Sequence, residues 1–304
     1  MISIVIPVKN GGSDLARCLQ GISEQVLDEE VETVVVDSGS TDGSLELLRR
    51  HGAIVREIPP HEFSHGASRN LGASLARGEV LVFISQDAYP VDERWLERLC
   101  APLRADPGVA GVYGRQLPHA GARPPERYFL DFLYGATARR QSATGVAELT
   151  METTLFSNVN AAVRRELWQL HPFVEDIVMS EDQDWCRRVL LDGYAVVYEP
   201  DAAVRHSHNY TLRGAFKRFF DSGASAARAY LAGQRTSRRV LRQAAVRYAR
   251  GELAWLWRTG QARWIPYTIV YEGVKMVGLL LGANHERLPL AVKRRLSALP
   301  GFWS

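Results

Sequence analysis

The feature that most constrains the fold is a regular alternation of short apolar runs with helical patterns over residues 1–116. Each apolar run has the length and the valine- and isoleucine-rich content of a buried parallel strand. Strands separated by helices imply βαβ units, so we predict an α/β fold with a mostly parallel, Rossmann-like sheet flanked by helices. Ser13 is the expected cap of the first helix. The predicted strands are Ile2–Pro7, Val31–Asp37, Ile54–Ile58, Val80–Ser85 and Val109–Gln116.

The pattern changes twice further along the chain. Leu117–Pro125 is rich in Pro, Gly and Ala, which is typical of a boundary between halves of a domain. Beyond it we expect a helix near Tyr128–Arg139, a helix at Glu181–Asp192 and a strand at Ala195–Glu199. We therefore divide the chain into one α/β domain, residues 1–210, with halves 1–116 and 117–210, and a helical region, residues 211–304.

The net charge of +3 conceals a strong asymmetry. Residues 1–200 carry a net charge of −10, whereas residues 201–304 carry +13. The basic C-terminal region is therefore expected to meet an anionic surface or ligand. Its most apolar stretch, Ile265–Ala283, is interrupted by Glu272 and Lys275, which favours a helix lying on a surface over a membrane span.

The cysteines and the first residues indicate the compartment. The three cysteines are far apart and form no CxxC pair, which argues for a reducing environment and against a disulfide framework. The chain opens on an apolar strand pattern without the basic segment of a signal peptide. We expect a cytoplasmic protein, peripheral on the inner face of the membrane if the basic region docks there.

Polar residues stand where the predicted strands end. Ligands of open α/β sheets bind beyond the carboxyl ends of the strands. Asp37 can accept hydrogen bonds from a base or a ribose, although its segment also suits a plain capping turn. Asp87 suits a hard divalent cation that keeps the oxygens of a substrate phosphate, although an Asp before a proline turn is often only a turn residue.

Two helix starts carry further candidates. Arg69 lies where a guanidinium and free helix N–H groups make a clamp for a diphosphate, or else on a solvated face. Ser180–Trp185 packs three carboxylates together, and crowding raises their pKa values toward those of a good general base. The simpler interpretation is that these acids favour the helix dipole. Trp185 either flanks an acceptor or packs in the core.

His206 and His208 are separated by one residue. In an extended chain they point to opposite faces, so they make no two-histidine chelate without a bend. We expect one of them, His206, to complete a metal shell with Asp87.

Five of these segments, in their order and spacing, resemble the family 2 glycosyltransferases, which have the GT-A fold. The resemblance covers about the first two-thirds of the chain, and five motifs in register are far more specific than any one of them. The matching segments are Ile4–Asn10, Val35–Gly43, Ala67–Gly72, Ser85–Ala88 and Glu181–Trp185.

The resemblance assigns the donor side of the site. It implies that Pro7, Lys9, Asp37 and Ser38 line the pocket of a nucleotide-sugar donor, with Ser38 standing where the family often has a second acid. It also implies that Gln86 faces the ribose or the sugar. Residues 1–116 are then the nucleotide-binding half and residues 117–210 the acceptor half.

The resemblance also assigns the chemistry. Asp87 matches the acid that binds a divalent cation, Mg²⁺ or Mn²⁺, and Asp182 matches the catalytic base of an inverting transfer. Cation and Arg69 together would stabilise the leaving nucleoside diphosphate. Glu181 and Trp185 are the acceptor-site candidates.

Within the family, four segments look like the rhamnosyltransferase branch, which uses dTDP-L-rhamnose and builds bacterial surface polysaccharides. They are Glu62–Gly66, Ser85–Ala88, His206–Tyr210 and Phe216–Asp221. The expected function is transfer of L-rhamnose to a glycan or lipid-linked acceptor. A UDP- or GDP-sugar donor and a non-catalytic nucleotide-binding scaffold stay as alternatives. A nucleotidyltransferase is disfavoured because Pro7–Gly12 lacks the basic, glycine-rich phosphate loop of that class.

The basic region 211–304 has three interpretations. One is a peripheral contact with an anionic membrane, since Arg and Lys are interleaved with Trp255, Trp257 and Trp264. Another is a solvated helix face or homodimer contact around Arg247 and Arg250. The third is binding of nucleic acid, which we do not expect because no nucleic-acid motif accompanies the charge.

Overall fold

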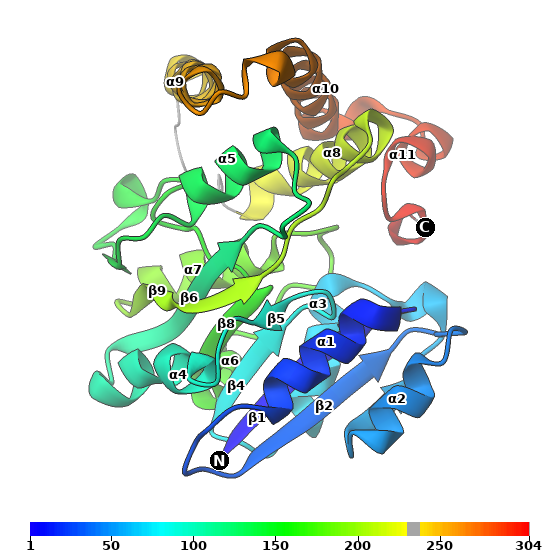
Figure 1. Cartoon of the computed structure of the whole chain (residues 1–304), viewed down its shortest axis with the longest axis vertical. Coiled ribbons are helices and arrows are strands. Elements are labelled where there is room, and N and C mark those ends of the chain that lie inside the picture. The colour runs from blue at the N-terminus through cyan, green and yellow to red at the C-terminus, as the bar shows by residue number, and fades with distance from the viewer. Residues whose placement is uncertain (230–237, 304) are drawn as a thin grey trace.

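The computed structural model describes residues 1–229 and 238–303. In these residues one nine-stranded sheet runs in the order β3-β2-β1-β4-β8-β6-β9-β5, with β7 paired to β9 (Figure 1). The parallel block is β1 (Ile2–Val8), β2 (Val31–Asp37), β3 (Ile54–Glu57) and β4 (Val80–Ile84). The remaining strands are β5 (Tyr89–Pro90), β6 (Val109–Leu117), β7 (Arg139–Gln141), β8 (Asn160–Arg164) and β9 (Ala195–Arg205).

Strand β8 makes the sheet mixed. It is antiparallel to both β4 and β6, while β6 and β9 are parallel to each other. The two faces of the sheet bury two separate apolar cores, because alternate strand residues point to opposite sides. Ile4 and Ile6 pack on one face with α1 and α4, and Val5 packs on the other with α3 and α7.

Helices cover both faces of the sheet. The first face carries α1 (Gly12–Ser23), α2 (Ser44–Arg50) and α4 (Trp95–Ala105). The second carries α3 (His65–Leu75), α6 (Arg165–Leu170) and α7 (Glu181–Leu191), with α5 (Pro124–Leu133) contributing to the same core. The predicted α/β class with a mostly parallel sheet and flanking helices is confirmed.

Three local predictions need correction. The N-cap of α1 is Gly11 rather than Ser13, and it makes no side-chain capping bond. Helix α5 begins at Pro124, earlier than expected, because proline suits the first helical position, and Arg139 already belongs to β7. The strand expected at Ala195–Glu199 continues to Arg205, because its pairing resumes beyond an irregularity with Gln116 and Leu117 of β6.

The C-terminal helices gather at one end of the molecule, far from β1 and β2 (Figure 1). They are α8 (Leu212–Ala229), α9 (Arg238–Arg258), α10 (Ile265–Ala283) and α11 (Leu290–Leu296). Helices α8 and α10 pack closely through glycine: a Cβ at Gly282 would meet the carbonyl oxygen of Phe220, and one at Gly278 that of Phe216. No helix in the described part of the chain is long and apolar enough to span a bilayer.

Candidate active site

The carboxyl ends of β1, β2 and β4 lie side by side and form the donor end of the site. Their loops are tied together by side chains: Gln86 accepts from the Lys9 N–H (2.9 Å) and donates to the Lys9 carbonyl (3.1 Å). Lys9 itself is exposed and Pro7 is half-buried near the end of β1. Both amide atoms of Gln86 therefore shape the loop after β1, which corrects the expectation that this amide faces the ribose or sugar.

Asp37 lies buried at the end of β2 and is only half satisfied. Its Oδ1 accepts from the N–H groups of Gly39 and Ser40, both at 2.9 Å, while Oδ2 is buried without a protein partner. A buried carboxylate oxygen without a partner is costly, so this atom is suited to an N–H or O–H of a ligand. Ser38 differs, because its hydroxyl donates to the Val8 carbonyl (3.2 Å) and is buried. The Ser38 hydroxyl thus spends its proton inside the protein and keeps only its lone pairs for a ligand.

Sequence reasoning missed how the loops after β1 and β2 are joined. Asn10, with a positive φ of 49°, accepts from the Thr41 N–H (2.8 Å) and donates through its own N–H to Ser40 Oγ (2.8 Å). Asp42 accepts from the Gly12 N–H at 3.0 Å. The Asn-Gly-Gly signal in the sequence marks a turn, but the partners of that turn lie some thirty residues away.

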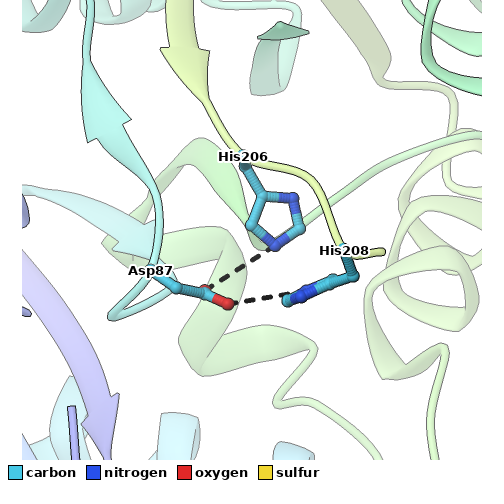
Figure 2. Close-up of side chains that lie close together, drawn as sticks. All are labelled: Asp87, His206 and His208. Carbon is cyan, nitrogen blue, oxygen red and sulfur yellow. Dashed lines mark ion pairs between the residues drawn. The ribbon is translucent and has the colours of Figure 1, made fainter. Parts of the chain in front are cut away.

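Asp87, His206 and His208 converge on one point (Figure 2). His206 Nε2 lies 3.6 Å from Asp87 Oδ1, and His208 Nε2 lies 3.5 Å from Asp87 Oδ2. Both histidines follow the end of β9 at Arg205, where the chain is no longer a strand, so two side chains spaced by one residue reach the same carboxylate. The structure brings Asp87 and His206 together as expected, and a bend after β9 brings His208 there as well.

Gln116 sets the orientation of the His206 ring. The Gln116 amide donates to Ser157 Oγ (3.0 Å), so its Oε1 accepts from His206 Nδ1 (2.9 Å). With the proton on Nδ1, the Nε2 lone pair faces the Asp87 carboxylate. Burial lowers the pKa of His206 to about 4 and also lowers that of His208, so both rings are neutral near pH 7.

Neutral imidazole nitrogens aimed at a carboxylate repel its oxygens unless a cation lies between them. Two nitrogens and a carboxylate within 4.8 Å of one another are a donor set that fits a divalent metal ion. The second-shell hydrogen bond to Nδ1 is the usual support of a metal-binding histidine. The residues present thus fit the cation that the sequence predicts.

The three acids at the start of α7 have different environments. Glu181 forms a buried ion pair with Arg69 (2.7 Å), and Asp184 forms two, with Arg187 (3.0 Å) and Arg188 (2.8 Å). Asp182 is half-buried and accepts from the N–H groups of Asn158 (3.0 Å) and Gln183 (2.8 Å). Within the described residues no Lys or Arg lies at ion-pair distance from Asp182.

The proton affinity of Asp182 follows from these contacts. Burial, and then the charge of Glu181, raise the pKa of Asp182 to about 7. For Glu181 burial is the largest effect and raises the pKa, but Arg69, His65 and the hydrogen bonds that Glu181 accepts together outweigh it, so its pKa is lowered. Glu181 thus remains ionised beside Asp182 and makes it a stronger base near neutral pH.

These contacts give three of the predicted site residues a structural role. Arg69 is buried and pairs with Glu181 through one guanidinium nitrogen. Trp185 is fully buried, where it packs against Phe156 and Phe173. The sequence of a helix start with three acids does not show which cations each acid contacts. Arg69 and Glu181 are 112 positions apart, and only the fold brings them together.

The segment Ser157–Asn158 connects Asp182 with the cluster of Asp87, His206 and His208. Ser157 accepts from Gln116, which holds His206, and the next residue, Asn158, donates to Asp182. The two groups therefore lie on either side of Ser157–Asn158, just before β8. A pocket adjoins this site and is lined by Arg123, Pro125, Glu126, His208, Asn209, Tyr210, Tyr267 and Tyr271.

The α/β fold, the tied strand ends and the cluster of Asp87, His206 and His208 are the features expected of a glycosyltransferase with the GT-A fold. The model of the family "Glycosyl transferase family 2" matches residues 3–170. The chain therefore belongs to glycosyl transferase family 2.

Two relatives are similar over nearly their whole length. One is the O-antigen chain rhamnosyltransferase RfbN of Salmonella typhimurium, 32% identical over 309 residues, covering 100% of this chain and 96% of the relative. The other is the O-antigen chain rhamnosyltransferase WbaN of Salmonella anatum, 30% identical over 307 residues, covering 99% and 95%.

Solved structures agree on the fold. The mannosyltransferase PcManGT of Pyrobaculum calidifontis, solved with GDP-Man and Mn²⁺, superposes with a TM-score of 0.61 at 22% identity and covers 92% of this chain and 86% of its own. Residues 1–349 of TarS from S. aureus, in complex with UDP-GlcNAc, give a TM-score of 0.54 at 15% identity, covering 94% and 91%.

Proposed function

We propose that the chain transfers L-rhamnose from dTDP-L-rhamnose to a glycan or lipid-linked acceptor, with inversion, in the synthesis of a bacterial surface polysaccharide. The choice of sugar is supported by the full-length similarity to two proteins named O-antigen chain rhamnosyltransferases. The observation that carries the chemistry is the unpaired carboxylate of Asp182, joined through Ser157–Asn158 to the triad of Asp87, His206 and His208.

In this proposal Asp182 accepts the proton of an acceptor hydroxyl as that oxygen attacks the anomeric carbon. The bond from the anomeric carbon to the diphosphate breaks, and its electron pair leaves with the nucleoside diphosphate. Because a single in-line attack occurs, the anomeric configuration inverts. Glu181 and Arg69 act indirectly and in opposite directions: the Glu181 charge adds to burial in raising the pKa of Asp182, and the Arg69 charge lowers it.

Asp87, His206 and His208 would hold the divalent cation, which supplies positive charge against the diphosphate. Because two of the three ligands are imidazole nitrogens, we propose Mn²⁺ rather than Mg²⁺, which favours oxygen ligands throughout. Asp37 Oδ2 would accept a hydrogen bond from the nucleoside, with Pro7 and Lys9 beside it. Residues 1–116 would bind the donor and 117–210 the acceptor, and residues 211–304 would contact the membrane.

The test is the thermal midpoint of the protein with dTDP, dTDP-rhamnose, UDP and GDP, each with and without Mn²⁺. A ligand that binds only the folded state raises the midpoint. We expect a Mn²⁺-dependent rise that is largest with dTDP-rhamnose, followed by transfer to an acceptor with inverted configuration by NMR. A larger rise with UDP or GDP would discard rhamnose and keep the glycosyltransferase, and nucleotide binding without any transfer would favour a scaffold.

A further inference from the structure

Helix α10 is apolar on two opposite faces. Its inner face, Thr268, Tyr271, Lys275, Gly278 and Gly282, is buried, and the two glycines pack against the backbone of α8. Its outer face consists of six large apolar side chains that are between 38% and 58% exposed: Ile269, Val270, Met276, Val277, Leu280 and Leu281. The two glycines of the inner face allow close packing on α8, whereas the outer face exposes large apolar side chains where a solvated surface helix carries polar ones.

The outer face is one continuous stripe. Its residues recur at intervals of four or seven, so they share one side of the helix over about 18 Å. A contiguous apolar patch of this kind marks an interaction surface rather than scattered exposure. Helices α9 and α10 form the outermost layer of the molecule, so the stripe faces away from the sheet (Figure 1).

The surroundings of the stripe are cationic. Residues 238–303 carry 12 Lys and Arg against three Asp and Glu. Glu252 is buried and Glu272 pairs with Lys275 (2.7 Å), so Glu286 is the one exposed acid among these three. Exposed arginines stand at both ends of α10: Arg258 and Arg263 before it, and Arg287 after it.

This charge decides between two kinds of partner. In a dimer formed through this face, the cationic residues around the stripe of one copy would lie against those of the other copy. Their mutual repulsion opposes association. An anionic bilayer complements the arginines and receives the apolar side chains in its headgroup region. Trp257, 72% exposed at the same end as Arg258, is the type of side chain that anchors at such an interface.

We propose that the outer face of α10 docks onto an anionic lipid bilayer, with the helix lying in the plane of the membrane surface. Tyr267 and Tyr271, on the same helix, line the pocket that contains His208 of the metal-binding triad. Docking therefore holds α10, and with it these two lining residues, at the bilayer surface, within reach of a lipid-linked acceptor. This last step rests on the proposed function, whereas the docking itself does not.

The experiment is flotation of the full chain with vesicles of equimolar phosphatidylcholine and phosphatidylglycerol, compared with phosphatidylcholine alone. We expect the wild type to float with the anionic vesicles only. Val277→Asp should reduce the bound fraction about tenfold or more, since it removes a buried apolar side chain from the bound state. The matched control is Leu170→Asp on α6, because Leu170 is 65% exposed and lies outside this face; it should float like the wild type.

A charge-reversal variant tests the second element of the surface. Arg258→Glu with Arg263→Glu should float less than the wild type on anionic vesicles, and added salt should weaken wild-type flotation. The proposal is overturned if the wild type does not float, or if Val277→Asp and Leu170→Asp lose flotation equally. It is also overturned if the wild type is a dimer in lipid-free solution that Val277→Asp dissociates, because a second copy then covers the face.

Nucleotide binding, followed by the thermal midpoint in the same samples, separates this inference from the proposed function. If the protein floats but dTDP-rhamnose does not raise its thermal midpoint, the donor assignment is refuted and the docking proposal is supported. If dTDP-rhamnose raises the midpoint but the protein does not float, the docking proposal is refuted and the donor assignment is supported.

Discussion

Replacing Asp182 by Asn keeps the size of the side chain and removes its proton affinity. In the proposed transfer this residue takes the acceptor proton, and a positioned general base contributes about 10²–10⁴-fold to a rate. We therefore expect Asp182→Asn to lower kcat by about that factor, with unchanged affinity for the nucleotide. The variant should fold: one of two N–H donors, from Asn158 or Gln183, would face the new amide nitrogen, at a cost of about 1–3 kcal/mol.

The wild type should also show the titration of this base. Because the pKa of Asp182 is raised to about 7, the carboxylate is the major form above that pH and the carboxylic acid below it. Activity should rise with pH through about 7 and be lost as the pH falls. At one unit below the pKa about one-tenth of the molecules hold the free base.

The assay is transfer to an acceptor between about pH 5.5 and 8.5, at saturating Mn²⁺. Mn²⁺ affinity is measured separately across the range, because protonation of the two histidines also removes metal. Asp184→Asn is the matched control, since Asp184 is paired with Arg187 and Arg188 and should alter stability rather than the pH profile. The reasoning is refuted if Asp182→Asn retains a kcat within about threefold of the wild type, or keeps the same acid limb.

Three further predictions follow from single contacts. Gln116→Ala should weaken Mn²⁺ binding by about 10–100-fold in a calorimetric titration, and Gln116→Glu, which keeps an acceptor for His206 Nδ1, should restore most of it; equal losses in both variants would contradict the orienting role. Arg69→Met should destabilise the fold by about 3–5 kcal/mol in urea unfolding, because it leaves Glu181 buried and unpaired, and a cost near zero would mean that the pair is solvated. Trp185→Phe should reduce stability while leaving the acceptor KM unchanged, and a KM effect at full stability would return Trp185 to the acceptor site.

The strands of the donor half could be read from the sequence because their signal is local. Val31–Asp37 was bounded correctly since a valine run between turn residues has few alternatives, and Asp37 and Asp87 follow from where such runs end. The C-terminal helices were equally visible, and the bounds expected for Ile265–Ala283 are those of α10. Helix α5 begins at Pro124, before the expected start near Tyr128, because the sequence pattern around its two prolines is also typical of a loop.

The hydrogen-bond and ion-pair partners of the site residues could not be predicted from the local sequence. Residue type favours a ligand role for Arg69 and the family resemblance implies one for Ser38 and Gln86, yet each contacts the protein itself. In a continuous strand His206 and His208 would point to opposite faces. Because β9 ends at Arg205, the chain bends and His208 also reaches Asp87. Gln116 carried no signal at all, since its importance lies in reaching His206 across 90 positions.

By itself, the sequence determined the α/β class, the edge of the sheet at which ligands bind, and the acids available for the chemistry, because periodicity and residue type are local properties. Tertiary structure decided which of the three acids is left without an arginine partner. Of three neighbouring carboxylates, two are neutralised by arginines and Asp182 is not, and that difference depends on which charges the fold brings within a few ångströms.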